Sequence, residues 1–172
     1  MKKIILIFAV LISLQAPAQQ VTKVSLQASG LTCSMCSNAI NKALKSLAFV
    51  DRIDANIKNS SFDVYFKPDM DIDFEKIKKK VEDAGFSVAN FSAVIHFNAV
   101  KMLDDYCMLV GETAFQIINT KEQLLNGDRQ VRFLDKGFVP AKEFKKNSSL
   151  FTKQQCYNRV GQKLTRVYHI TI

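Results

Sequence analysis

Alternating strand and helix patterns over residues 23–91 constrain the fold of this chain more than any other feature. Apolar residues alternate with polar ones at Val24, Leu26 and Ala28, just ahead of Gly30, which predicts a half-buried strand. The following segments change type in turn: a helix at 36–47, strands at 52–57 and 62–67, a helix at 74–84 and a strand from residue 86. The order βαββαβ predicts a ferredoxin-like domain.

The C-terminal half has a different pattern, with short apolar stretches separated by turn signals. We expect strands at 94–102, 107–110, 114–118, 130–134, 137–139 and 165–172, turns at 126–128 and 135–137, and a short helix within 148–160. These segments predict a small, mainly β domain at 92–172, either an oligonucleotide/oligosaccharide-binding-like (OB-like) barrel or a sandwich. The chain is therefore expected to be α+β, with a ferredoxin-like domain at 19–91. Residues 89–98 contain no Gly or Pro, so the last ferredoxin strand is able to run directly into the second domain.

Two cysteines three residues apart, Cys33 and Cys36, lie between the first predicted strand and helix. A helix N-terminus favours the thiolate over the thiol, and thiolates bind soft metal ions. Zinc takes four protein ligands, or three and a water, but the only histidines, His96 and His169, lie in predicted strands of the other half. We expect both histidines to be ordinary strand residues with hydrogen-bond partners. Two sulfur ligands alone favour Cu(I), with Hg(II) next.

The segment from about Val21 to Asn90 resembles the heavy-metal-associated domain of copper chaperones, copper-pump N-termini and periplasmic mercury-binding proteins. The stretches GLTCSMCSNAINKALKSL and IKKKVEDAGFSV carry the resemblance. It implies one soft metal ion on Cys33 and Cys36, passed by ligand exchange to a thiol site on a partner such as a membrane metal transporter. Leu31 stands where the family usually has Met, a swap of similar size, and Phe86 matches a position beside the metal loop.

Other roles for the dithiol remain open. It could cycle as a thiol–disulfide oxidoreductase, close as a structural disulfide, or tune the stability of a non-catalytic interaction module. Thioredoxin-type enzymes carry a Trp before the motif and Gly-Pro inside it, whereas this chain has no Trp and reads Ser34-Met35 between the cysteines. We therefore expect a metal carrier and no enzyme.

Positive charge is concentrated in the C-terminal half. Residues 91–172 hold 12 basic and 7 acidic residues, whereas residues 19–90 hold 10 and 9. In an exported protein, this excess suits weak contact with an acidic surface, and we expect no nucleic-acid partner.

The remaining cysteines, Cys107 and Cys156, both lie in the C-terminal half. An oxidising compartment permits a disulfide between them. Closing a loop of about 50 residues would add about 4 kcal/mol to the free energy of unfolding in the chain-entropy model. Such a bond would leave Cys33 and Cys36 as the free thiol pair.

The first 18 residues predict a cleavable signal peptide and a periplasmic or otherwise exported protein. Lys2 and Lys3 precede an apolar stretch at 4–14, and Ala16-Pro17-Ala18 is a small-residue cleavage site. We predict that the mature protein begins at Gln19, which N-terminal sequencing of the exported form will check. A membrane-bound chain that retains Met1 would show that the segment is an anchor.

Overall fold

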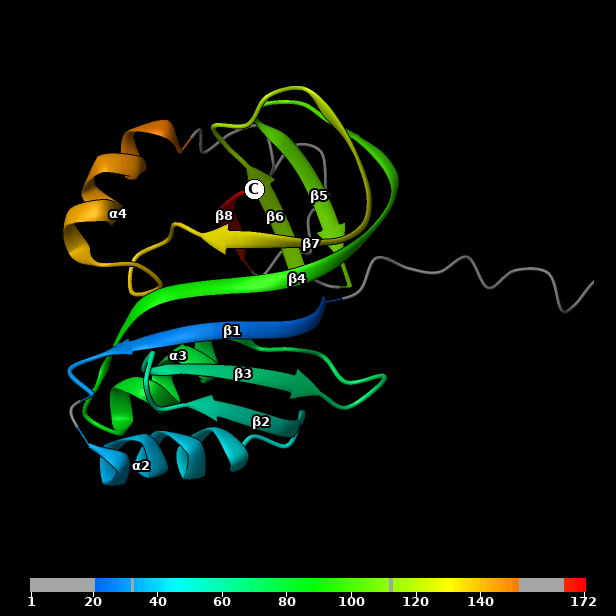
Figure 1. The fold of residues 1–172 in the computed structure, drawn as a ribbon. Coiled ribbons are helices and arrows are strands. Elements are labelled where there is room, and N and C mark those ends of the chain that lie inside the picture. The colour runs from blue at the N-terminus through cyan, green and yellow to red at the C-terminus, as the bar shows by residue number, and fades with distance from the viewer. Residues whose placement is uncertain (1–20, 32, 112, 152–165) are drawn as a thin grey trace, which may run out of the picture.

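All the strands described here belong to one sheet. The computed structural model describes residues 21–31, 33–111, 113–151 and 166–172. Along the chain they form β1 (Val21–Ser29), α2 (Ser34–Lys45), β2 (Val50–Asn56), β3 (Ser61–Phe66), α3 (Phe74–Asp83), β4 (Ser87–Met102), β5 (Tyr106–Val110), β6 (Thr113–Ile117), β7 (Gln123–Phe133), α4 (Ala141–Asn147), the 3₁₀ turn η1 (Ser148–Leu150) and β8 (Val167–Thr171). The strand order is β2-β3-β1-β4-β7-β8-β6-β5 (Figure 1).

The first six elements confirm the predicted βαββαβ order. β1 lies between β3 and β4 and is antiparallel to both. The apolar side of β1, at Val24 and Leu26, shares one buried cluster with Ile40 and Leu44 of α2 and Ile77 of α3. The alternate positions of β1 face away from these helices, as the period of a strand requires.

β4 joins the two halves of the chain. Its 16 residues pair with β1 from Ser87 to Ile95 and with β7 from Ser92 to Met102. The domain boundary expected between residues 91 and 92 therefore falls inside a strand. The expected OB-like barrel or sandwich is not confirmed, because the described C-terminal strands extend the ferredoxin sheet, and the sheet is open with β2 and β5 at its ends.

A cluster of buried aromatic rings makes the core continuous across that boundary. Neighbouring ring centroids lie 4.9 to 6.1 Å apart, mostly edge to face, among Phe74, Phe91, Phe115, Phe133, Phe138 and Tyr168. Phe74 opens α3, whereas Phe133 and Tyr168 belong to β7 and β8. Each such pair is worth about 0.5–1.5 kcal/mol beyond its buried area. Burial, with the charge of Glu75 nearby, raises the pKa of the Tyr168 phenol above its usual range.

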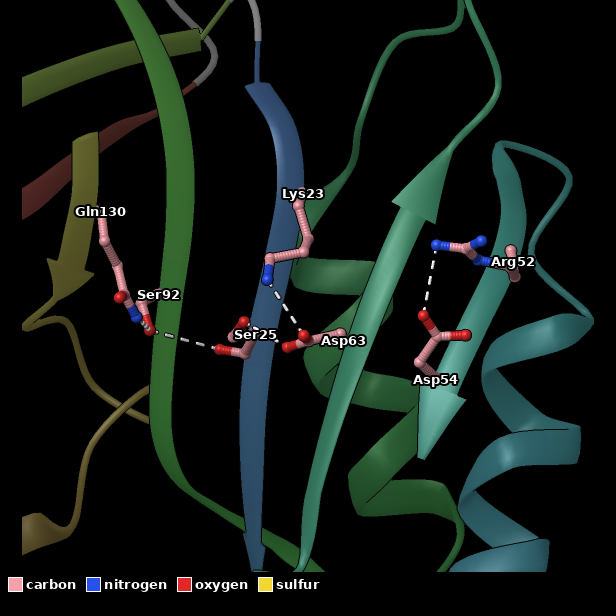
Figure 2. A network of polar contacts seen from close by, with 7 residues as sticks. All are labelled: Lys23, Ser25, Arg52, Asp54, Asp63, Ser92 and Gln130. Carbon is pink, nitrogen blue, oxygen red and sulfur yellow. Dashed lines mark hydrogen bonds and ion pairs between the residues drawn. The ribbon is translucent and has the colours of Figure 1, made fainter. Parts of the chain in front are cut away.

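Polar side chains link four strands across the sheet (Figure 2). Asp63 of β3 accepts hydrogen bonds from Ser25 and Lys23 of β1, the latter at 2.9 Å. Ser92 of β4 donates to the Ser25 carbonyl oxygen at 3.4 Å and accepts from the Gln130 amide of β7 at 2.9 Å. The hydrogen bond to Asp63 favours the charged form of Lys23 and raises its pKa.

The turn predicted at Asn126-Gly127-Asp128 is wrong, because these residues lie within β7. Gly127 has a φ of +73° and pairs with Phe97, and the register shifts between Phe97 and Val100. Ala99 at the shift has a φ of +48°, and its N–H donates to Asn126 Oδ1 at 3.3 Å. The Asn-Gly signal therefore marks a bulge, which increases the local twist where β4 and β7 pair.

The region after β7 is confirmed in part. Phe138 N–H donates to the Asp135 carbonyl oxygen at 3.1 Å, which closes the turn expected at 135–137. The strand expected at 137–139 is reduced to one bridge between Lys136 and Val139. Of the helix expected within 148–160, the described residues contain only the 3₁₀ turn η1 at 148–150, and residues 152–160 lie outside the described part of the chain. The helix α4 at 141–147 was not predicted.

Both histidines have the hydrogen-bond partners expected of them. His96 Nδ1 lies 2.7 Å from Asp128 Oδ1, and His169 Nδ1 lies 2.9 Å from Asp135 Oδ1. The ring of Phe151 stacks on that of His169 with centroids 3.9 Å apart.

Two further expectations involve residues outside the described part. Cys107 on β5 is disulfide-bonded, but Cys156 lies outside the described residues, so their pairing stays a prediction. The expected signal peptide at 1–18 also lies outside. Among the described helices, none is both long enough and apolar enough to span a bilayer.

The shared aromatic cluster predicts that the two halves unfold together. Phe133→Ala is expected to cost about 3–5 kcal/mol of unfolding free energy, because it removes a ring fully buried among five others. When urea unfolding is monitored by hydrogen exchange of amides in β2 and in β6, both strands should unfold in one common transition. Leu124→Ala, at a side chain that is 66% exposed, is the control and should change stability by less than about 0.5 kcal/mol. Separate transitions for β2 and β6 would contradict a shared core.

Candidate metal centre

The two cysteines lie where β1 ends and α2 begins. Cys33 is the N-cap of α2, with extended backbone angles of φ −148° and ψ 158°. Its Sγ accepts a hydrogen bond from the Cys36 N–H at 3.3 Å, and its carbonyl oxygen accepts one from the Ser37 N–H at 3.2 Å. Cys33 thus takes the capping role usually filled by Ser, Thr, Asp or Asn. The helix start consequently fixes the position of the first sulfur.

The sulfur atoms face each other at the surface. Cys33 Sγ and Cys36 Sγ lie 2.6 Å apart as thiols rather than as a disulfide, and Cys33 is exposed while Cys36 is half-buried. A hydrogen bond from the Cys36 side chain, followed by one from the Cys36 backbone N–H, holds the pKa of Cys33 below its usual value. The first turn of α2 contains no acidic residue that would oppose a thiolate. The site is therefore suited to a thiolate that solvent and partners can reach.

Phe86 is placed beside this loop by the end of α3. The Phe86 N–H donates to the Val81 carbonyl oxygen at 3.2 Å, and the Gly85 N–H donates to that of Glu82 at 2.9 Å. This is a Schellman C-cap, which requires the left-handed φ of +87° that Gly85 adopts. Pairing of Ser29 with Ser87 then brings the start of β4 next to the end of β1. Leu31 and Phe86 both pack, partly buried, against the core.

The β2–β3 turn forms a further side of the site that the sequence analysis missed. A shallow depression beside Cys33 is lined by Leu31, Ser34, Ser37, Ile57, Lys58 and Ser60. The predicted βαββαβ order could have indicated this side of the site, because it puts the β2–β3 turn and the β1–α2 loop at the same end of the sheet (Figure 1).

The other candidate ligands do not converge on the dithiol. His96 lies on β4 and His169 on β8, each against an aspartate, and Met35 is 81% exposed between the cysteines. Within the described residues, no group of three or more His, Cys, Asp and Glu side chains could hold a metal ion. The donor set that the described part of the structure offers at the loop is two sulfurs.

Comparison with known proteins agrees with this geometry. The family model of the heavy-metal-associated domain matches residues 25–87. These residues belong to the heavy-metal-associated domain family. The match includes the dithiol loop, both helices and the start of β4, and residues 88–172 lie outside it.

Individual relatives match about two fifths of this chain. A probable copper-exporting P-type ATPase of Archaeoglobus fulgidus is 32% identical over 71 residues, which are 41% of this chain but only 9% of that protein. Oxidized MerP from Ralstonia metallidurans is 32% identical and covers 41% of this chain and 97% of its own, with a TM-score of 0.36. A chain in the Atx1–Cu(I)–Ccc2a complex is 33% identical, with 39% and 90% covered and a TM-score of 0.35.

The lowered pKa of Cys33 predicts early reactivity toward alkylating agents. A thiol whose pKa is lowered by folding becomes thiolate at a pH below that of the unfolded chain, so its alkylation should begin at lower pH in the folded, reduced protein. Peptide mass spectrometry of iodoacetamide-treated protein across a range of pH will report Cys33 separately. The urea-unfolded chain is the control, and equal midpoints in the two states would contradict the assignment.

Proposed function

We propose that this chain is an exported carrier that binds one soft metal ion on Cys33 and Cys36 and passes it to a partner by ligand exchange. The observation that supports this most strongly is the pair of surface thiols at a helix N-cap, within a domain of the heavy-metal-associated family. Binding and release are then the whole activity, and we propose no catalytic step.

Transfer is favoured by how open the site is. The described residues supply two sulfurs, so an incoming thiolate has room to become a third ligand before one of the original two leaves. A closed site of four protein ligands would have to unfold first. The sulfurs would also have to move apart, because 2.6 Å between them leaves no room for a metal ion. Rotation of the exposed Cys33 side chain can supply part of this movement.

Cu(I) is the ion that we propose first, with Hg(II) second. Two soft ligands without nitrogen or oxygen donors suit a soft ion of low coordination number. The names of two relatives, a copper-exporting ATPase and the Atx1–Cu(I)–Ccc2a complex, support copper, and the name of the third, MerP, does not decide the matter.

The proposed partner is a protein that presents its own thiol site, such as a domain of a membrane metal transporter. The complex of Atx1, Cu(I) and Ccc2a provides a relative in which two proteins and the metal ion are found together. We place the carrier in the periplasm or another exported location on the basis of the N-terminal targeting pattern. The basic C-terminal half would make only weak contact with an acidic surface there.

Loss of either sulfur should abolish tight Cu(I) binding. Cys33→Ser and Cys36→Ser each leave one soft ligand, and a serine hydroxyl at position 33 would still cap α2, so circular dichroism should stay unchanged. Anaerobic competition against a Cu(I) chelator measures the affinity. Met35→Ala is the matched control and should bind like the wild type, because Met35 is 81% exposed. Wild-type Cu(I) affinity in either serine variant would show that Cys33 and Cys36 are not the metal ligands.

A thiol–disulfide oxidoreductase is the rival function, and the same preparation can test it. An enzyme would catalyse insulin reduction with the metal-free dithiol, whereas a carrier would take up one Cu(I) per chain and leave insulin unreduced. A chain that did neither would be an interaction module.

A further inference from the structure

Lys58 lies on the β2–β3 turn, on the same depression of the surface as Cys33. Together with Cys33 it lines the shallow depression beside the metal loop. Of the described residues around that depression, Lys58 alone carries a fixed charge. It is exposed and makes no hydrogen bond or ion pair with any residue that the structure describes. No carboxylate among the described residues therefore neutralises its ammonium group.

The turn that carries Lys58 is tied to the end of β1. Gln27 Nε2 donates to the Asn59 carbonyl oxygen at 3.0 Å, and the Ala28 N–H donates to that of Ser60 at 3.0 Å. Within the turn, the Asn59 N–H donates to Asn56 Oδ1 at 3.1 Å. β1 leads directly into the loop of Cys33, so the backbone of Lys58 and that of the dithiol are held to the same strand end.

No other lysine of the metal-binding loop or of α2 competes for this role. The basic residues in the last turn of α2 are Lys42 and Lys45. Lys42 is eight residues beyond the start of the helix, or about 12 Å along its axis at 1.5 Å per residue. That distance exceeds the screening length of about 8 Å at physiological ionic strength.

The net charge of the loaded site differs between the two candidate ions. Two thiolates with Cu(I) carry one negative charge, whereas two thiolates with Hg(II) carry none. We propose that Lys58 is a specificity-determining residue, whose positive charge stabilises the site loaded with a monovalent ion and leaves the site loaded with a divalent ion unaffected. This inference rests on the proposed metal-carrier function.

The test measures two metals on one set of variants. Reduced full-length chain is titrated anaerobically with Cu(I) against a chelator, and with Hg(II) against a small dithiol. Lys58→Gln should lower the ratio of the Cu(I) affinity to the Hg(II) affinity about two- to fivefold, as expected for an exposed charge pair. Any effect of Lys58 on the free dithiol is the same for both ions and cancels in this ratio. Lys58→Arg keeps the charge and should retain wild-type affinity for Cu(I). Lys45→Gln, an equal loss of charge at the far end of α2, is the matched control and should bind both ions like the wild type.

Salt provides a readout that a structural role of Lys58 would not give. The difference in this affinity ratio between wild type and Lys58→Gln should shrink at about 1 M salt, where the screening length falls to about 3 Å. An unchanged ratio of Cu(I) to Hg(II) affinity in Lys58→Gln, including an equal loss for both ions, would overturn the role of Lys58 while leaving the carrier function intact. Wild-type protein that binds neither ion would overturn the carrier function, and this inference with it.

Discussion

The shared strand β4 and the aromatic cluster beneath it hold the rest of the molecule in place. β4 gives one edge to β1 and the other to β7, so the metal-binding module and the C-terminal half have no independent sheets. Phe74 and Phe133, with ring centroids 5.1 Å apart, bring α3 of the first half into the core of the second. Backbone pairing and buried rings thus join the two halves at the same place. Separating the halves would expose both the unpaired strand edges and the aromatic rings to water.

This coupling reaches the dithiol through α3. The first residue of that helix, Phe74, lies in the aromatic cluster, and its C-cap leads into Phe86 beside the metal loop. The ion pair between Arg166 and Glu75, at 2.6 Å, adds a second attachment near the first residue of the helix. The C-terminal half therefore helps to set where α3 lies, and with it the start of β4 next to the end of β1.

The sequence predicts those features that depend on local pattern. Alternation at Val24, Leu26 and Ala28 and helical spacing from Cys36 to Leu47 indicate the βαββαβ order, because each buried face repeats with its own period. The site loop was predicted for the same reason, since a Cys pair at a strand–helix junction is a local signal. Lys58 was missed because its closeness to Cys33 depends on the folded positions of two separate loops.

Features that depend on long-range pairing could not be predicted in the same way. Asn126-Gly127 is a hairpin signal by itself, and it became a bulge because β7 continues beside residues 97–100 of β4. The aromatic rings that meet in the core are far apart in sequence, from Phe74 to Tyr168, and no periodicity relates them. The absence of Gly and Pro from residues 89–98 indicates a continuous strand. Whether the C-terminal strands join one sheet or close a barrel depends on which strands pair, and local sequence does not determine that pairing.

In the proposed function, two cysteine sulfurs and no other side chain hold the metal ion. X-ray absorption spectroscopy of the Cu(I)-loaded full-length chain counts those ligands directly. We expect one copper per chain with two sulfur neighbours and no imidazole scattering from His96 or His169. A copper ion with a histidine ligand, or with three or four ligands from this chain, would contradict it.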